Sequence, residues 1–285
     1  MNLPATIEKP DYVVIGHITQ DITPEGLTPG GTVLYSGLTA HAMGMKVGIL
    51  SAIKSDFELA LPAGVQLHIK NSDVTSRFKN VQTSSGRMQY IYQKASDLLA
   101  ADVPDAWLGA KIVHLGPVAC EVDPAILGRF KNAVKCVTPQ GWMRGWDADG
   151  LIFYKKWQDY QNTLSHANIA SFSIEDVQYE EDVIEQIAGC IPVLAVTEAQ
   201  NGARVYWNGD IRRFRAPQME ENDVTGAGDI FAAAFFTRYQ QTRNPWEAAR
   251  LATKLASGSI ARRGLHSIPT RKEIQNHKIE IIEEI

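Results

Sequence analysis

The chain has 285 residues, of which 45% are hydrophobic and 21% charged, and its formal net charge is −4. This balance is typical of one globular α/β domain and argues against nucleic acid or an anionic membrane as a partner. The first residues carry acids and prolines, unlike a secretory signal peptide, and no apolar stretch approaches the roughly 20 residues that a membrane span needs. Three cysteines without a CxxC spacing favour a reducing compartment, so we expect a cytoplasmic protein.

The first fifty residues predict a parallel β-α-β arrangement. Residues 11–22, "DYVVIGHITQDI", predict a buried strand, and residues 23–31 are turn-rich. Residues 32–45 have helical spacing with Gly44 as a stop signal, and residues 46–53 predict the next strand. A strand, a helix and a strand in this order favour a parallel sheet with helical crossovers.

Residues 64–95 have a different pattern, because short alternating strands with polar faces are separated by turns such as "SSG". They predict a small separate sheet. Beyond them, four short apolar runs predict buried strands, with helical patterns at residues 123–133 and 179–189 between some of them. Ligands bind at the carboxyl edge of such sheets. The residues expected at that edge are Gly116, Gln140, Ser173 and Thr197.

The last third of the chain contains two well-marked local elements. Residues 203–216 alternate around Asn208-Gly209 and predict a hairpin. Asn244 and Pro245 predict the start of a helix. No internal repeat, low-complexity tract or long linker divides the chain, so we expect one core domain, residues 1–285, with a small β appendage.

The segment "DVTGAGD", Asp223 to Asp229, combines small residues with two acids and precedes an Ala- and Phe-rich helix. The uncovered N–H groups of Gly226, Ala227 and Gly228, together with a helix N-terminus, predict an anion site suited to phosphate. An ionised Asp229 beside such a site predicts a general base for an attacking hydroxyl. A tight turn with a helix-capping acid is the competing interpretation. A dinucleotide turn is excluded, because "MEEND" precedes the glycines where a strand is needed.

This segment resembles the C-terminal signature of the ribokinase-like (PfkB) carbohydrate kinase family. The segments "VVIGHITQDIT", "PGGTVLYSGLTAHAMG", "VTEAQNGARVYW" and "ARRGLHSIPTRKEI" resemble further family elements in the same order. The resemblance implies a three-layer α/β fold: a mostly parallel central sheet flanked by helices, with a small β-sheet lid at about residues 22–30 and 64–95.

The family's roles carry over to matching positions. The resemblance implies that Asp229 is the catalytic base and that the Gly226–Gly228 segment is the anion hole. The other implied sites are as follows: Thr197, Gly202 and Thr225 bind the nucleotide; Asp21, Gly30, Gly31, Tyr35 and Arg144 bind the acceptor; Glu175 and Asp176 bind Mg²⁺; and Asp223 helps to hold a monovalent cation such as K⁺. For Arg144, a plain surface position is the competing interpretation. For Glu175 and Asp176, it is a pair of solvated acids at the start of a helix 175–188.

Three positions depart from the family pattern. Ala199 stands where the nucleotide segment usually has a glycine, Tyr35 where an asparagine is usual, and "SIED", from Ser173, replaces the family's N-x-x-E. An alanine is tolerated at position 199 unless the backbone there needs a positive φ.

We therefore expect an ATP- and Mg²⁺-dependent kinase that phosphorylates a hydroxyl of a small sugar, a polyol such as inositol, or a nucleoside. Because of the three departures, a catalytically weak ligand-binding or sensor protein with the same fold stays open as the alternative. Exposed edges of the lid strands favour a homodimer through the lid.

Overall fold

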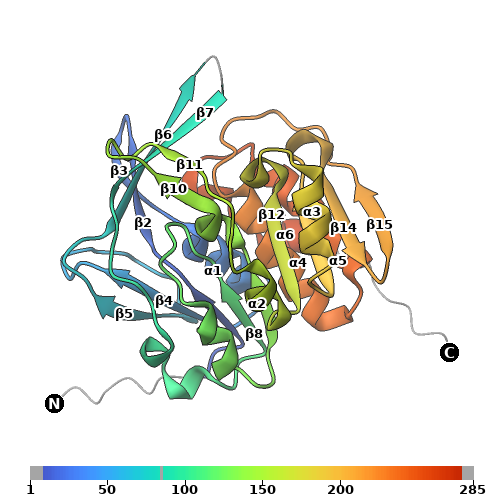
Figure 1. Ribbon diagram of the computed structural model, residues 1–285, viewed down its shortest axis with the longest axis horizontal. Helices are drawn as coiled ribbons and strands as arrows, with labels where there is room; N and C mark the ends of the chain where they lie inside the picture. Colours follow the sequence, from blue (N-terminus) through green and yellow to red (C-terminus); the bar gives the residue numbers. More distant parts are fainter. Residues whose placement is uncertain (1–8, 84–85, 278–285) are drawn as a thin grey trace.

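The computed structural model describes residues 9–83 and 86–277. Its centre is a nine-stranded sheet in which seven adjacent strands run parallel, and the two remaining strands, at one edge, are joined by antiparallel pairing (Figure 1). In spatial order the strands are β15 (Asp210–Phe214), β14 (Ala203–Trp207), β13 (Val193–Thr197), β12 (Ile169–Ser173), β9 (Val134–Val137), β8 (Ile112–Leu115), β1 (Tyr12–Ile15), β4 (Val47–Ile53) and β5 (Val65–Asn71).

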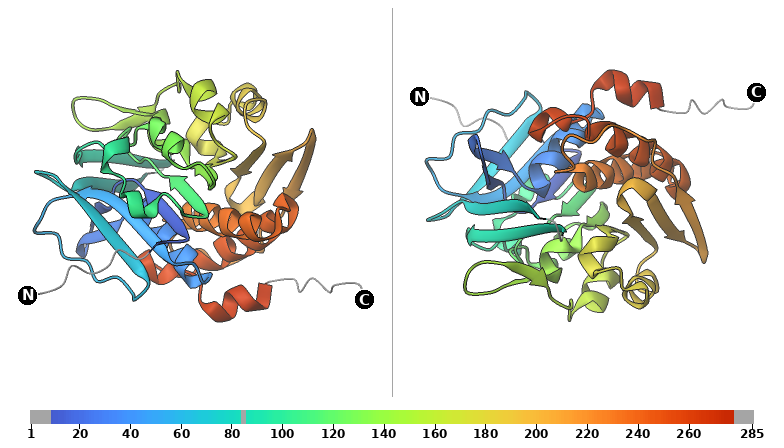
Figure 2. Two further views of the ribbon diagram at one scale, coloured as in Figure 1. Left: turned by 90° about the horizontal axis from the view of Figure 1, so that it is seen from below. Right: turned by 90° about the horizontal axis from the view of Figure 1, so that it is seen from above.

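Helices cover both faces of this sheet, so the core has three layers. One face packs against α1 (Thr32–Ala42), α4 (Ala227–Thr242), α5 (Pro245–Ser259) and α6 (Arg271–His277). The other face packs against α2 (Tyr160–Ser165), α3 (Glu181–Ala188) and several short 3₁₀ segments. Helices α4 and α5 lie side by side (Figure 2). The predicted fold class is therefore confirmed.

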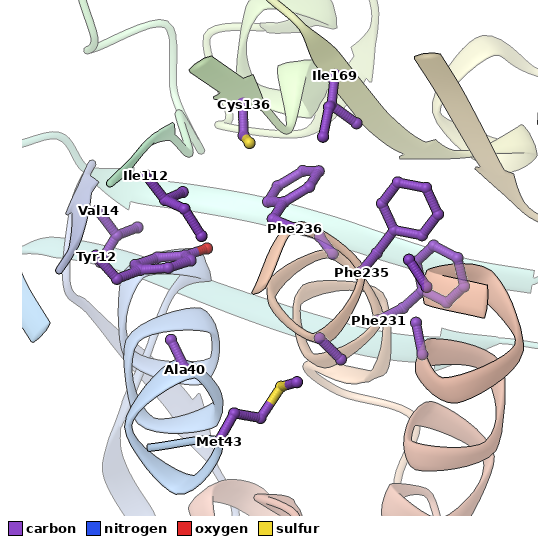
Figure 3. Close-up of a cluster of buried hydrophobic side chains, with 14 of the residues drawn as sticks. Tyr12, Val14, Ala40, Met43, Ile112, Cys136, Ile169, Phe231, Phe235 and Phe236 are labelled. Carbon is purple, nitrogen blue, oxygen red and sulfur yellow. The ribbon is translucent and has the colours of Figure 1, made fainter. Parts of the chain in front are cut away.

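The alternation of β1 and the aromatic residues of α4 explain how these layers join. Tyr12 and Val14 face the α4 side, and Val13 and Ile15 face the opposite side. Phe235 and Phe236 of α4 are fully buried and point between the strands (Figure 3). Burying a side chain of this size contributes about 1.5–3 kcal/mol, so this packing holds the middle of α4 against the sheet.

A second sheet of four strands projects beyond one end of the main sheet (Figure 1). Its order is β3 (Gly26–Gly30), β2 (Thr19–Thr23), β6 (Ser76–Thr83) and β7 (Gly86–Gln93); β2 and β6 run parallel and the other pairs antiparallel. The hairpin of β10 (Arg144–Trp146) and β11 (Ile152–Tyr154) lies beside β7, where the Ile91 N–H donates to the Gly150 carbonyl at 2.9 Å. These strands form the lid.

The predicted start of the second lid segment, residues 64–95, was wrong. Residues 65–71 form β5, which pairs in parallel with β4 at the edge of the main sheet. An edge strand is only partly covered, so its alternating pattern matched that of a lid strand. Residues 22–30 do belong to the lid, as expected, but they form most of the hairpin of β2 and β3 rather than a loop.

The predicted first strand, residues 11–22, is also divided into two. It leaves the main sheet after Ile15, and a side chain at Gly16 would collide with the carbonyl of Gly116. The N–H of Ile18 then donates to Ser51 Oγ at 2.8 Å, and the chain enters the lid at Thr19. Asp21 is therefore a lid residue, not the last residue of the first strand.

Local signals near the C-terminus were confirmed. Asn208 and Gly209 both have positive φ in the β14–β15 turn, and the Asn244 side chain caps α5 by accepting from two backbone N–H groups.

The expected helix 175–188 is interrupted, because Gln178 and Tyr179 have φ of 52° and 63° and separate a short 3₁₀ turn from α3. Among the described residues, no helix is long and apolar enough to cross a membrane.

The 3₁₀ segments complete the element order. They are η1 (Ala100–Asp102), η2 (Asp105–Trp107), η3 (Pro124–Arg129), η4 (Pro139–Met143), η5 (Ile174–Val177), η6 (Ala199–Asn201) and η7 (Gly264–Ser267). The expected helix at residues 123–133 is the short η3, which starts at an Asp123 cap.

Candidate active site

A cavity of about 1550 Å³ lies between the lid, the carboxyl ends of the central strands and the N-termini of α1 and α4. It brings together residues from across the chain, which we call the cleft. The predicted site residues that line it are Asp21, Gly31, Tyr35, Arg144, Glu175, Asp176, Thr197, Gly202, Thr225, Gly226, Ala227, Gly228 and Asp229. Gly30 and Asp223 do not line it.

The N-terminus of α4 presents its backbone to the cleft. Gly226 is the N-cap residue with φ of 81°, and a side chain there would collide with the ring of Tyr35. The N–H of Ala227 donates to the Val224 carbonyl at 3.1 Å. The N–H groups of Gly226 and Gly228 donate to no carbonyl in the described part of the chain. The donors that face a ligand are therefore those of Gly226 and Gly228, while the amide of Ala227 is engaged in the turn.

Asp229 lies in the first turn of α4. The hydroxyl of Ser36, on α1, donates to the backbone carbonyl of Asp229 at 3.2 Å and ties the two helix N-termini together. A carboxylate in the first turn of a helix is stabilised in its charged form by about 0.3–1 kcal/mol. Asp229 is thus a half-exposed acid at the cleft, next to the two amide donors.

Tyr35 separates the two ends of the cleft. It is 3% exposed, lines the cavity and lies against Gly226, which explains why no side chain fits at position 226. Burial first, and then the charges of Asp21, Asp223 and Asp229, raise the pKa of Tyr35, so its hydroxyl stays protonated. Tyr35 therefore places a bulky neutral side chain between Asp21 of the lid and the loop at Gly226 that precedes α4.

The lid contributes Asp21 to one end of the cleft. The Thr19 hydroxyl donates to Asp21 Oδ1 at 2.9 Å, and Gly30 packs so closely that a side chain there would collide with Asp21 Oδ2. The absence of a side chain at Gly30 therefore leaves the space that the Asp21 carboxylate occupies. The φ of Gly31 is 94°, and a side chain there would meet the carbonyl of His17.

Arg144 joins the lid to the core at the same end of the cleft. Its Nη2 donates to Gln89 Oε1 on β7 at 3.1 Å and to Gln140 Oε1 after β9 at 2.9 Å. The Gln140 side chain in turn donates to Thr32 Oγ1 at 3.0 Å. Gln140 was expected at the sheet edge, but the sequence analysis missed Gln89 and Asn80 as lining residues. Asn80 lies two residues from the buried Phe78, and Gln89 two residues from the buried Ile91, so each shares the inward face of its strand.

The segment from Thr197 to Gly202 lines the other end of the cleft. Its backbone closes on itself, because the Glu198 N–H donates to the Gly202 carbonyl at 2.7 Å and the Gly202 N–H to the Ala199 carbonyl at 3.0 Å. Gly202 has φ of 94° and Ala199 has φ of 48°. The departure from glycine at position 199 therefore falls on a backbone that glycine adopts more readily.

Replacing Ala199 by glycine should raise the free energy of unfolding by about 0.5–1 kcal/mol, because the left-handed conformation costs alanine more than glycine. Denaturant unfolding followed by circular dichroism measures it. Ala148→Gly is the control: this exposed loop alanine lacks a positive φ and should lose stability. If Ala199→Gly were also less stable than the wild type, the backbone at position 199 would not be strained.

Two of the acids proposed to bind cations, Asp176 and Asp223, accept hydrogen bonds from backbone N–H groups. Asp176 Oδ2 accepts the Ser173 N–H at 2.9 Å in a capping box, and Glu175 and Asp176 both line the cleft. Asp223 accepts the N–H groups of Thr225 and Gly264 at 2.9 and 3.1 Å. Burial opposes ionisation of Asp223, but these hydrogen bonds and the charge of Arg263 outweigh it, so its pKa is lowered. In the described part of the chain, no three His, Cys, Asp or Glu side chains are grouped as for a metal.

Comparisons with known proteins agree with this geometry. Residues 148–271 match the model of the pfkB family carbohydrate kinases. A cytidine kinase of Thermococcus kodakarensis is 26% identical, covering 90% of this chain and 99% of that protein. An inositol 3-kinase of Zea mays is 30% identical, covering 65% of this chain and 48% of that protein. A solved pyrophosphate-dependent kinase of the ribokinase family has a TM-score of 0.78 at 18% identity, covering 94% of this chain and 100% of that one, a likeness in fold.

Proposed function

The chain belongs to the pfkB family of carbohydrate kinases, and on this premise we propose that it transfers the γ-phosphoryl group of ATP to a hydroxyl of a sugar, a polyol or a nucleoside. The observation that carries the proposal is that one cleft holds both the donors of the α4 N-terminus and the lid acid Asp21. Its volume, about 1550 Å³, exceeds the roughly 300–1,000 Å³ of a site for one small molecule. There is room for a phosphoryl donor and an acceptor together.

Each end of the cleft suits one substrate. The Thr197–Gly202 segment and α5 offer backbone and small side chains to a nucleotide, and the Gly226 and Gly228 amides offer donors to its phosphates. Asp21, Gln89 and Gln140 offer acceptor and donor groups of the kind that bind hydroxyls. Tyr35 lies between the two ends.

The proposed transfer needs few groups. The carboxylate of Asp229 takes the proton from the acceptor hydroxyl, whose oxygen forms the new bond to the γ-phosphorus. The bond from that phosphorus to the bridging oxygen breaks, and ADP leaves. The amides of Gly226 and Gly228 donate to the charge on the transferring oxygens, an electrostatic contribution that is usually the largest in phosphoryl transfer. Lid residues shield the reacting atoms from water.

Two cations fit acids that lie in the cleft or next to it. Magnesium binds one or two protein carboxylates and completes its shell with phosphates and water, a need that Glu175 and Asp176 meet. When bound, Mg²⁺ neutralises charge on the donor phosphates. For a monovalent cation, the ionised Asp223 lies beside η7, where the Ser267 hydroxyl is buried without a hydrogen-bond partner among the described residues.

A kinase assay tests the proposal. The purified chain is incubated with ATP and Mg²⁺ and a panel of sugars, polyols and nucleosides, with pyrophosphate as a second donor. Phosphorylation of one acceptor class with ATP is expected. Turnover with pyrophosphate but not with ATP would overturn the choice of donor. Tight acceptor binding with no phosphorylated product would favour the ligand-binding or sensor alternative.

We also predict that Asp21→Ala weakens acceptor binding by about 10- to 100-fold and leaves ATP affinity unchanged. A carboxylate that accepts hydroxyl hydrogen bonds contributes roughly 1.5–3 kcal/mol per bond. Calorimetric titrations with ATP and with the acceptor found in the panel measure both affinities. Glu25→Ala, an exposed acid in the turn of the same hairpin, is the matched control and should change neither. Equal acceptor affinity in Asp21→Ala and the wild type would remove Asp21 from the site.

A further inference from the structure

Behind the nucleotide end of the cleft, Arg204 is buried between two carboxylates. It lies on β14 and is 5% exposed. Its Nη1 and Nη2 donate to the two carboxylate oxygens of Glu181 at 2.8 and 3.0 Å. Its Nε lies 2.7 Å from Glu198 Oε1, and the Glu198 side chain is only 15% exposed. The guanidinium therefore hydrogen-bonds Glu181 and forms an ion pair with Glu198, although its Nε–H is not aligned for a hydrogen bond.

The two acids lie on different elements behind the cleft. Glu198 lies between Thr197 and Ala199, within the segment that lines the nucleotide end. Glu181 lies in the first turn of α3, which follows the η5 turn that carries Glu175 and Asp176. Arg204 thus connects the nucleotide segment to the element that follows the proposed magnesium acids.

Arg204, Glu198 and Glu181 do not line the cleft themselves, so an effect on ligands must pass through other residues. The neighbouring segment needs such support. It is a tight loop in which Ala199 has φ of 48° and Gly202 has φ of 94°, and one strained alanine costs roughly 1–2 kcal/mol. The hydrogen bond from Arg204, first of all, lowers the pKa of Glu181.

We propose that Arg204 is a positioning residue for the phosphoryl donor: by holding Glu198 and Glu181, it fixes the Thr197–Gly202 loop relative to α3. This inference rests on the proposed function, in which that loop binds ATP. A buried charge pair of this kind is weak evidence for stability, because desolvation offsets the attraction. What the bridge provides is a side-chain link between this loop and α3.

The test compares three variants. Arg204→Met removes the bridge, Glu198→Gln weakens its loop end, and Glu181→Gln weakens its α3 end, where the side chain is 53% exposed. For Arg204→Met and Glu198→Gln, kcat/KM for ATP should fall by about 10- to 100-fold, because a displacement of roughly 1 Å in a substrate-binding element can cost that much. The KM for the acceptor should stay within about twofold.

Controls separate positioning from stability. Glu181→Gln should also lower kcat/KM for ATP, but by less than Arg204→Met, because the glutamine oxygen can still accept one of the two hydrogen bonds from Arg204. Arg204→Lys should recover part of the loss, because an ammonium can still pair with Glu198. The double variant Glu198→Gln/Arg204→Met should be no worse than Arg204→Met, as expected for residues that act as one unit. Each variant is assayed at least about 10 °C below its own melting temperature.

The outcomes distinguish this inference from the proposed function. If the wild type binds no ATP by calorimetry, the proposed function fails. If the wild type binds ATP and both Arg204→Met and Glu198→Gln bind it equally well, Arg204 has no positioning role. Glu198→Gln keeps the side-chain size, so it decides the question even where Arg204→Met does not fold.

Discussion

Replacing Asp229 by asparagine should lower kcat by about 10²–10⁴-fold and leave ATP affinity nearly unchanged. The substitution keeps the size and the position of the side chain in the first turn of α4 but removes its ability to accept a proton. The amides of Gly226 and Gly228 are backbone groups, so the phosphate site is preserved. Single-turnover measurements at saturating ATP and acceptor give the chemical step, and calorimetry gives the affinity.

The competing interpretation of Asp229 is a helix cap, and it predicts a different result. A lost charge in the first helical turn costs about 0.3–1 kcal/mol of stability and has no effect on turnover. Asp182→Asn is the matched control, because Asp182 is an exposed acid in the first turn of α3 and outside the cleft. If Asp229→Asn kept more than about a tenth of the wild-type kcat, Asp229 would be no more than a cap.

Local backbone signals could be predicted from the sequence because they depend on a few neighbouring residues. The Asn208-Gly209 turn requires two residues that tolerate positive φ, and both have it. The cap at Asn244 and the start of α4 at the Gly226–Gly228 segment are of the same kind. The segment Asp223–Asp229 belongs to this class, and most of its residues line the cleft.

The rest depends on contacts between distant segments. The edge position of β5 follows from its pairing with β4, which its own alternation does not reveal. The switch of the first strand into the lid depends on Ser51, which accepts the Ile18 N–H. The contact of Tyr35 with Gly226 joins α1 to α4 and has no local signature. The same holds for the bridge of Arg204 to two acids from different elements.

Gly228→Val should lower kcat by at least about 10²-fold while the chain stays folded. Gly228 has no positive φ, and a side chain there would meet nothing within 4 Å, so the backbone accepts valine. The added methyl groups would instead stand in the cleft, beside one of the two amides that face the phosphoryl group. Loss of one such donor typically costs about 10²–10³-fold in kcat.

The neighbouring Gly226 is not suited to the same test. A side chain at Gly226 would strain a φ of 81° and displace Tyr35, so a loss of activity there would report on folding as much as on chemistry. Gly128→Val is the matched control, since Gly128 likewise has open space around it but lies in η3, away from the cleft. Gly228→Ala should fall between wild type and valine, because one methyl group obstructs less than three carbon atoms. Full kcat in Gly228→Val, with an unchanged circular dichroism spectrum, would mean that the transferring phosphoryl group does not pass the N-terminus of α4, and the mechanism would have to be rebuilt around another part of the cleft.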